Sequence, residues 1–439
     1  MEQPNVTHDG EARLTPQFWV AVALTGVATG LFGDLLMWVL QQFEHLGFRY
    51  NSGSYQNAVA AVSKVRRVVS LVSAGVIGAL VWYLIRRYLK HEKSEIDDAI
   101  WNGDGELAPR RSLATSLISE VVIGLGASLG REAAPKLMGG ASGSVISHWF
   151  HLSPQQKRLL VACGGGAGLA AVYNVPLGGA IFTAEVLYGS FALPVALPAL
   201  ATSLIATSVA WIYLPSGATY TDIPDYRFSF SLMVWSLVAG SLIGLLAVFY
   251  VRLIGWVSHH RARGAQIFWT MPLAFLIVGV AGIWYPQLFG NGKDMAHEAF
   301  LGVGGIGLLL ALFILKPFAT ALTIGAGASG GVFTPLLSTG AVLGGFLGLA
   351  WVHLWPGTPI GAFALIGAAA MIGSSMQAPL TGLVLVMELT HNGFSIMVPM
   401  MAATAIATMI VRHLDGYSIY SARLPRHDGS AESPETQVS

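Results

Sequence analysis

Apolar stretches about as long as a membrane-spanning helix follow one another along most of this chain. The hydrocarbon core of a bilayer is about 30 Å thick, which an α-helix crosses in about 20 residues. The longest stretches cover residues 18–40, 68–85, 191–214, 232–257, 271–288, 303–324 and 396–411. The pattern predicts an all-α integral membrane protein, with a single transmembrane domain over residues 1–439.

Two further apolar stretches, 176–188 and 379–391, are too short to cross a bilayer. Each begins at a proline, which the first turn of a helix accepts because its missing N–H has no intrahelical partner there. We expect re-entrant helices that enter the membrane without crossing it. Such breaks in helical structure are tolerated at membrane depth only inside protein or beside a water-filled cavity.

Composition supports the membrane assignment and argues against a soluble or nucleic-acid-binding protein. Of the 439 residues, 54% are hydrophobic and only 11% are charged, against about 25% charged residues in soluble domains. The net charge of +1 gives no electrostatic reason to expect nucleic-acid binding. The polar end of the chain, 425–439, is predicted to be a disordered tail.

The chain repeats itself in its glycine-rich segments. Residues 126–139 resemble residues 327–340, so that Gly130 aligns with Gly331 at an offset of 201. Each segment is a small-residue loop that leads into an apolar helix. Paired glycine-rich breaks before membrane helices indicate an anion site, because they leave helix N-termini with free N–H groups at membrane depth.

The repeat extends to the two short apolar stretches, where Glu185 matches Glu388 at an offset of 203. The matches predict two homologous halves, roughly 16–214 and 230–420. Whether the halves are parallel or inverted depends on the number of crossings in each, which the glycine-broken helices leave open. Because the two glutamates hold equivalent positions, a shared structural role is favoured for both.

Glu132 is the best candidate for chemistry, since it follows Gly130-Arg131 and opens an apolar helix. A carboxylate at membrane depth is costly unless it is paired or functional. The N-terminus of a helix stabilises a carboxylate and a mobile anion alike, so the two would compete for one site and protonation of Glu132 would vacate it. The alternative is that Glu132 only caps its own helix and pairs with Arg131.

Other candidates are weaker by themselves. Phe333, the repeat counterpart of Glu132, is more typical of core packing, and Glu120 is expected to be hydrogen-bonded inside the bundle or at a subunit contact. Tyr420 follows the last span and is either an interfacial anchor or a donor to an anion. Neither a nucleotide-binding loop nor a metal-binding motif occurs in the sequence, so we expect no cofactor, no metal and no enzymatic activity.

Cationic residues predict the orientation in the membrane. They gather in two groups of connections, and positively charged loops are retained on the cytoplasmic side: Arg86, Arg87, Lys90, Lys93, Arg110 and Arg111 in the first half, and Arg252, Arg261 and Arg263 in the second. The 215–229 connection carries more acidic than basic residues and is expected outside. We expect a multi-pass protein of the plasma (inner) membrane with both termini in the cytoplasm.

Several motifs together resemble the CLC family of chloride channels and chloride/proton exchangers, in particular its short bacterial members without cytoplasmic nucleotide-binding modules. They appear in order along nearly the whole chain: Gly130-Arg131-Glu132, the segment 174–185, Gly290-Asn291-Gly292, Gly331-Val332-Phe333-Thr334-Pro335, and Tyr420. The resemblance implies two inverted, interlocked halves of tilted and broken helices. It also implies a homodimer with one pore in each subunit.

The resemblance also assigns roles to residues. Glu132 would be the gating and proton-carrying glutamate. The backbone N–H groups of Val332 and Phe333, with the Tyr420 hydroxyl, would hold a central anion. Backbone around Arg131, Glu132 and Ala133 would form an outer anion site.

Three departures from the family pattern bear on function. The stretch at 90–94 lacks the Gly-Ser-Gly-Ile-Pro loop that supplies a serine ligand, and Ala-Ala-Pro replaces Gly-Pro after Glu132. Coupled exchangers commonly carry a second glutamate where this chain has Val186, although Glu185 is adjacent and is a possible internal proton route. These departures favour passive, chloride-preferring transport, channel-like or weakly coupled to protons. The alternatives are stoichiometric chloride/proton exchange and secondary transport of another small anion.

Overall fold

The computed structural model describes residues 12–89 and 95–424, and within them the regular structure is almost entirely helical. The first half of the chain forms α1 (Pro16–Phe48), α2 (Tyr55–Ala61), α3 (Lys64–Tyr88), α4 (Ile96–Trp101), α5 (Pro109–Gly124), α6 (Ala133–Trp149), α7 (Pro154–Tyr173), α8 (Pro176–Phe182) with a following π-helical turn (Thr183–Tyr188), and α9 (Leu193–Ala210). The second half forms α10 (Phe230–His259), α11 (Ile267–Ala281), α12 (Lys293–Phe300), α13 (Ile306–Gly325), α14 (Phe333–Val352), α15 (Ile360–Met376), α16 (Pro379–Thr390) and α17 (Met397–Leu414).

Among the described residues, 8 helices are long and apolar enough to cross a membrane. Seven of them, α1, α3, α9, α10, α11, α13 and α17, overlap the stretches predicted from the sequence, although α11 ends at Ala281 where the prediction ran to 288. The eighth, α14, was predicted only as the apolar helix that follows the second glycine-rich loop. The two short stretches form short helices, as expected. An all-α, multi-pass membrane protein is therefore confirmed, whereas the repeat bounds 16–214 and 230–420 stay predictions and the tail 425–439 lies outside the described residues.

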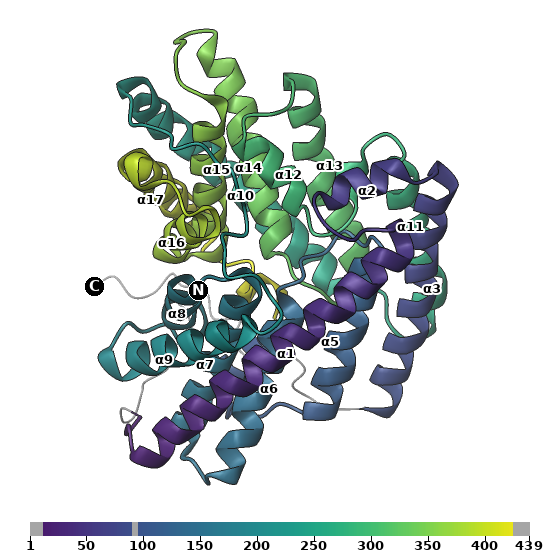
Figure 1. Ribbon diagram of the computed structural model, residues 1–439, viewed down its shortest axis with the longest axis vertical. Coiled ribbons are helices and arrows are strands. Elements are labelled where there is room, and N and C mark those ends of the chain that lie inside the picture. Colours follow the sequence, from purple (N-terminus) through teal and green to yellow (C-terminus); the bar gives the residue numbers. More distant parts are fainter. Residues whose placement is uncertain (1–11, 90–94, 425–439) are drawn as a thin grey trace, which may run out of the picture.

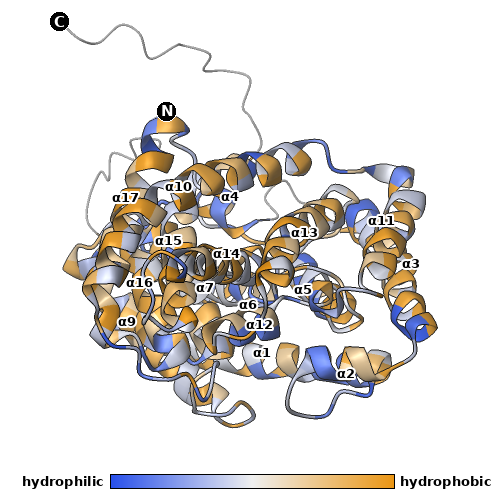
Figure 2. Ribbon diagram, turned by 90° about the horizontal axis from the view of Figure 1, so that it is seen from above, coloured by the Kyte–Doolittle hydropathy of each residue, from blue (hydrophilic) through white to orange (hydrophobic). Residues whose placement is uncertain are grey.

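The halves interlock rather than sit apart. In Figure 1, α1 and α5–α9 lie in the lower part of the molecule and α10 and α12–α17 in the upper part, while α3 of the first half packs against α11 of the second. Figure 2 shows apolar residues along most of the outer helices, and polar residues mainly in the connections. An apolar periphery of this kind matches a lipid environment.

Local sequence sets the helix ends that shape the centre of the molecule. Ser153 and Gln156 form a capping box at the start of α7. The same helix ends at Asn174, whose φ of 55° is left-handed, a conformation that asparagine tolerates better than most residues. Proline at the first position of α8 then starts the next helix in a new direction. This turn leaves Tyr173 at the C-terminal end of α7.

Two contacts join equivalent points of the repeat. Gly130 and Gly331 exchange backbone hydrogen bonds in an antiparallel bridge, with N···O distances of 2.7 and 2.9 Å. Two residues that hold the same place in both halves thus bond directly to each other. Such a contact requires a local two-fold relation between the two loops.

The second contact is the reciprocal capping of α8 and α16. The Glu185 carboxylate accepts from the Leu380 N–H at 3.2 Å and from the Thr381 N–H at 2.6 Å, while Glu388 accepts from the N–H groups of Leu177 and Gly178. Each glutamate therefore neutralises the free N–H groups at the start of the other half's short helix. The shared structural role predicted for the pair is confirmed.

Candidate functional site

The two glycine-rich loops meet in the interior of the protein and bring two helix N-termini together. Glu132 directly precedes α6, and α14 begins at Phe333, whose side chain is only 1% exposed. The Gly130–Gly331 bridge fixes the relative position of the two loops. The site therefore takes its carboxylate from one half of the repeat and its free backbone N–H groups from the other.

The Glu132 carboxylate binds the N-terminus of α14 rather than its own helix. Its Oε1 accepts the Phe333 N–H at 2.7 Å, and its Oε2 lies 3.4 Å from the Thr334 hydroxyl and 3.5 Å from the Tyr173 hydroxyl. No side-chain hydrogen bond caps α6. The alternative, in which Glu132 serves only as a cap for its own helix, is therefore wrong. Its oxygens occupy a position where a helix N-terminus can also hold a free anion.

Glycine is required on both sides of this carboxylate. A Cβ built on Gly331 would overlap Oε1 and Cδ of Glu132, and a Cβ on Gly130 would overlap both carboxylate oxygens. Neither glycine has a positive φ, so the need is for space rather than for an unusual backbone conformation. The glycines that opened the repeat thus leave room for a carboxylate, or for an ion of similar size, between the loops.

A pocket of about 250 Å³ lies on the side of the connection that follows α9. Arg131 lines it, and the Arg131 guanidinium stands 4.9 Å from the centre of the Tyr173 ring. Glu44, Lys293 and Asp294 also line it, together with Leu214, Pro215, Gly217, Ala218 and Thr219. We call this the outer pocket, because the sequence predicts the 215–229 connection to lie outside the cell.

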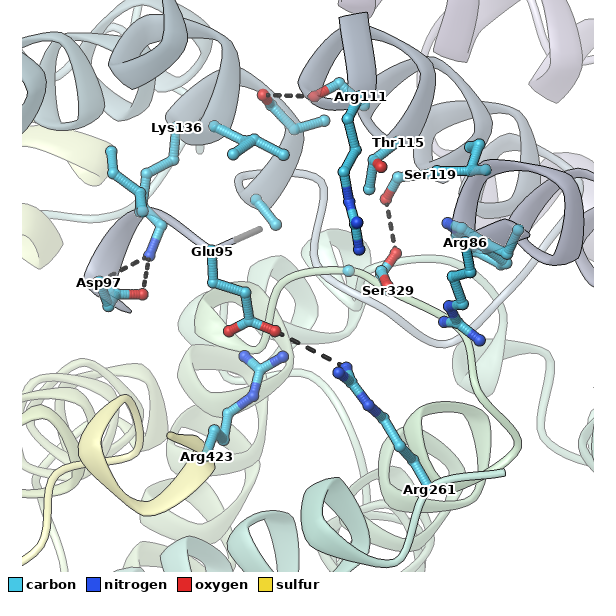
Figure 3. A pocket seen from close by; sticks show the side chains of 18 residues that line it. Arg86, Glu95, Asp97, Arg111, Thr115, Ser119, Lys136, Arg261, Ser329 and Arg423 are labelled. Carbon is cyan, nitrogen blue, oxygen red and sulfur yellow. Dashed lines mark hydrogen bonds and ion pairs between the residues drawn. The ribbon is translucent and has the colours of Figure 1, made fainter. Parts of the chain in front are cut away.

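A second pocket, of about 110 Å³, lies where the cationic connections gather, and we call it the inner pocket. Figure 3 shows its charged residues converging from several elements: Arg86, Arg111, Lys136, Arg261 and Arg423, with Glu95 and Asp97. Burial raises the pKa of the Glu95 carboxyl, but the charges of Arg423, Arg261 and Lys136 outweigh it and hold that pKa below its usual value. Glu95 is therefore ionised at neutral pH, and the five cations leave the inner pocket positively charged.

Glu132 stands between these pockets. Arg131 lines the outer pocket and Ala133 lines the inner one, whereas the Glu132 side chain, on a residue 4% exposed, points to the start of α14. The two residues that flank Glu132 in the chain therefore line two different pockets. Protonation or displacement of the Glu132 carboxylate would therefore change the barrier between the outer pocket and the inner pocket.

The predicted site residues are only partly brought together. Arg131, Glu132, Ala133, Val332 and Phe333 lie in the two joined loops. Tyr420 comes from the segment after α17, where it is 7% exposed and its ring lies 5.9 Å from that of Phe182. Glu185 lies in the contact between α8 and α16, with both carboxylate oxygens hydrogen-bonded.

Sequence reasoning missed three residues beside Glu132. Tyr173 and Thr334 contact its carboxylate and each other, although both fall in or next to segments that carried the family resemblance. Lys136 follows Glu132 by four residues, the spacing that places two side chains on one face of a helix. The expected departure at 90–94 lies outside the described residues.

Within the described part of the chain, Glu120 lacks the hydrogen bond expected for it inside the bundle, whereas a role at a subunit contact stays a prediction. Its side chain is fully buried in α5, and both carboxylate oxygens lack a hydrogen-bond partner among the described residues.

Lys316, which sequence analysis did not single out, is also fully buried, but its Nζ donates to the carbonyl oxygens of Gly290 at 2.8 Å and Leu288 at 3.2 Å. This lysine anchors the turn that precedes α12.

Comparison with known proteins agrees with the fold and with the resemblance. Residues 77–412 match the family described as voltage gated chloride channel. The H(+)/Cl(-) exchange transporter ClcA of Yersinia pestis is 29% identical over 95% of this chain and 89% of that protein. A putative chloride channel protein, ClcB-like, of Ralstonia nicotianae is 31% identical over 86% of this chain and 90% of that protein.

Among solved structures, a slow cyanobacterial Cl⁻/H⁺ antiporter shares the fold, with a TM-score of 0.81 and 23% identity over 93% of this chain and 97% of that one. The family match covers well over half of the sequence and includes both glycine-rich loops. This chain therefore belongs to the CLC family of voltage-gated chloride channels and related exchangers, and its family function is anion transport.

Proposed function

We propose that this protein exchanges chloride for protons across the membrane. In this proposal, the proton binds to the Glu132 carboxylate and chloride takes the place of that carboxylate. The observation that carries the proposal is the position of the Glu132 carboxylate, which is bound to the Phe333 N–H while the residues before and after it line two different pockets. An ionised carboxylate and a chloride ion cannot occupy the same N–H groups at once. A proton on Glu132 weakens its hold there and lets the anion in.

The competition gives a coupled cycle. When Glu132 is ionised, it blocks the anion path. When it takes a proton, its side chain can leave the start of α14, and chloride binds the backbone N–H groups of Val332 and Phe333, with the Tyr420 hydroxyl as a further donor. Backbone around Arg131, Glu132 and Ala133 holds a second anion nearer the outer pocket. Loss of the proton to the opposite side returns the carboxylate and completes the exchange.

Relatives support the coupled reading over the channel-like reading favoured by the sequence, because several of them are named exchange transporters. The channel-like alternative keeps two observations in its favour. Other relatives, 30% and 31% identical to this chain, are named chloride channels. Val186, at the position where exchangers commonly carry a second glutamate, is apolar and 5% exposed. In the exchange proposal, the internal proton passes by Glu185 or by water.

The deciding experiment measures proton movement. Purified protein in liposomes is given an outward chloride gradient, with potassium and valinomycin setting the voltage, and the internal pH is followed by a dye. Exchange predicts uphill proton uptake that reverses with the chloride gradient. Chloride flux without proton movement would support the channel-like alternative.

Glu132→Gln is the matched variant for the same assay, because it keeps the shape of the protonated side chain. It is expected to carry chloride at a rate nearly independent of pH, with no proton uptake. Wild-type pH dependence in Glu132→Gln would place the gate elsewhere.

We also propose a plasma (inner) membrane location with both termini in the cytoplasm, and a homodimer with one pathway in each subunit. The orientation rests on the cationic connections that surround the inner pocket. Single-molecule photobleaching of a labelled protein in liposomes tests the dimer, for which two bleaching steps are expected. Cysteine labelling of the 215–229 connection from outside tests the orientation.

A further inference from the structure

Lys136 places a positive charge in the wall of the inner pocket. It lies one turn beyond Glu132 on α6, and its backbone N–H donates to the Glu132 carbonyl at 3.1 Å. Its side chain lines the inner pocket and is 12% exposed. Figure 3 shows the Lys136 side chain reaching down toward Asp97, away from the arginines on the other side of the pocket.

The lysine ammonium has two close neighbours. Its Nζ lies 2.9 and 3.3 Å from the two carboxylate oxygens of Asp97, which is itself buried at the start of α4. The same Nζ stands 4.4 Å from the centre of the Tyr420 ring. Lys136 therefore lies between the inner pocket and Tyr420, whose hydroxyl is proposed above as an anion ligand.

A purely structural ion pair is a poor explanation for this arrangement. Buried ion pairs contribute little net stability compared with apolar side chains of the same size, and ionisable groups at membrane depth mark ion pathways more often than they hold helices together. An ammonium also has three donors, and only Asp97 accepts from Lys136 among the described residues. A donor and an excess of positive potential remain for the pocket.

We propose that Lys136 sets the affinity of the inner end of the pathway for anions, and that Asp97 is its positioning residue. The ammonium attracts the permeant halide as it passes from the inner pocket toward Tyr420. The Asp97 carboxylate holds the ammonium in place and offsets part of its charge, so that the halide binds and still leaves. The inference rests on the proposed function, because it assumes that the inner pocket lies on the anion path.

Because Lys136 and Asp97 carry opposite charges, neutralising one or the other should shift the chloride Kd in opposite directions. Lys136→Met removes the attraction and leaves the Asp97 carboxylate beside the path, so the chloride Kd should rise by roughly tenfold or more. Asp97→Asn leaves the lysine charge uncompensated, so the Kd should fall by roughly threefold. The double variant, which removes both charges, should lie between the two, and Lys136→Arg should stay near the wild type.

The experiment measures chloride and bromide binding to the purified protein by isothermal titration calorimetry in detergent. Lys157→Met is the matched control, because Lys157 is 11% exposed and lies 3.8 Å from Glu106 on another part of the protein. A structural role for the pair predicts that Lys136→Met and Asp97→Asn lower thermal stability together and leave halide affinity unchanged. Opposite shifts of affinity are expected only if the charges act on the anion.

The inference is overturned if the folded Asp97→Asn variant binds chloride no more tightly than the wild type. If Asp97→Asn does not fold, the comparison of Lys136→Met with Lys136→Arg decides, and equal chloride affinity of these two overturns the inference. Failure of the proposed function looks different, because the wild type itself would then show neither halide binding nor chloride-driven proton uptake.

Discussion

Alanine at Gly331 would displace the Glu132 carboxylate without removing any group that binds an ion. The new Cβ would overlap Oε1 and Cδ of Glu132. Gly331 has no positive φ, so alanine fits its backbone. The overlapped atoms are the far end of a flexible side chain, and the least costly relief is for the carboxylate to leave the start of α14.

The magnitude follows from the hydrogen bond that is lost. Oε1 accepts the Phe333 N–H at 2.7 Å, and a hydrogen bond to a charged group contributes about 1.5–3 kcal/mol. Since 1.36 kcal/mol corresponds to a tenfold change in an equilibrium, the bound carboxylate should become roughly 10- to 150-fold less populated relative to displaced positions. Gly331→Ala should then resemble Glu132→Gln at every pH, although the glutamate is still present.

Chloride efflux from liposomes between pH 4.5 and pH 7.5 measures this effect. If protonation of Glu132 opens the path in the wild type, its efflux should fall as the pH rises, while Gly331→Ala should keep most of its low-pH rate at pH 7.5. Gly325→Ala is the control, because a Cβ there would make only an ordinary contact with Val257 at 3.6 Å. A folded Gly331→Ala protein with wild-type pH dependence would refute the idea that carboxylate occupancy gates the path.

Two further substitutions test separate contacts. Tyr420→Phe should weaken chloride binding by at most about 1.5–3 kcal/mol, through loss of one hydrogen bond to a charged partner, which calorimetric titration measures. Glu185→Gln and Glu388→Gln should each lower unfolding stability by at least about 1.5 kcal/mol, because each glutamate accepts from two N–H groups. Thermal unfolding in detergent checks this, and a loss of proton uptake in Glu185→Gln alone would identify Glu185 as the internal proton route.

Much of the fold was predictable because membranes impose strong rules on sequence. A stretch such as 232–257 has few alternatives to a spanning helix, and α10 indeed covers it. The 201-residue offset predicted that Gly130 and Gly331 are equivalent, but equivalence does not imply contact. That these two residues bond directly depends on where the local two-fold relation falls, and no pattern along one chain records that position.

Contacts at the site were hard to predict for a similar reason. Glu132 was found because a carboxylate beside glycines at membrane depth is unusual. Tyr173 was missed because its contact with Glu132 crosses between α7 and the loop before α6, and the sequence carries no spacing signal for it. Lys136 did carry a signal, its four-residue spacing from Glu132, but that spacing alone does not tell a surface cation from one that lines a pocket.

The site forms where the two repeats differ in sequence although their backbones are related by a local two-fold. The Gly130–Gly331 bridge and the reciprocal capping by Glu185 and Glu388 keep the two halves matched. At the central position, one half carries Glu132 and the other carries Phe333, which offers only its backbone N–H. Two carboxylates there would repel each other and leave no donor for an anion, whereas two apolar residues would leave a site with no proton to exchange. If the proposed function is correct, one acid bound at the N-terminus of the helix from the other half lets a proton and an anion compete for the same N–H groups.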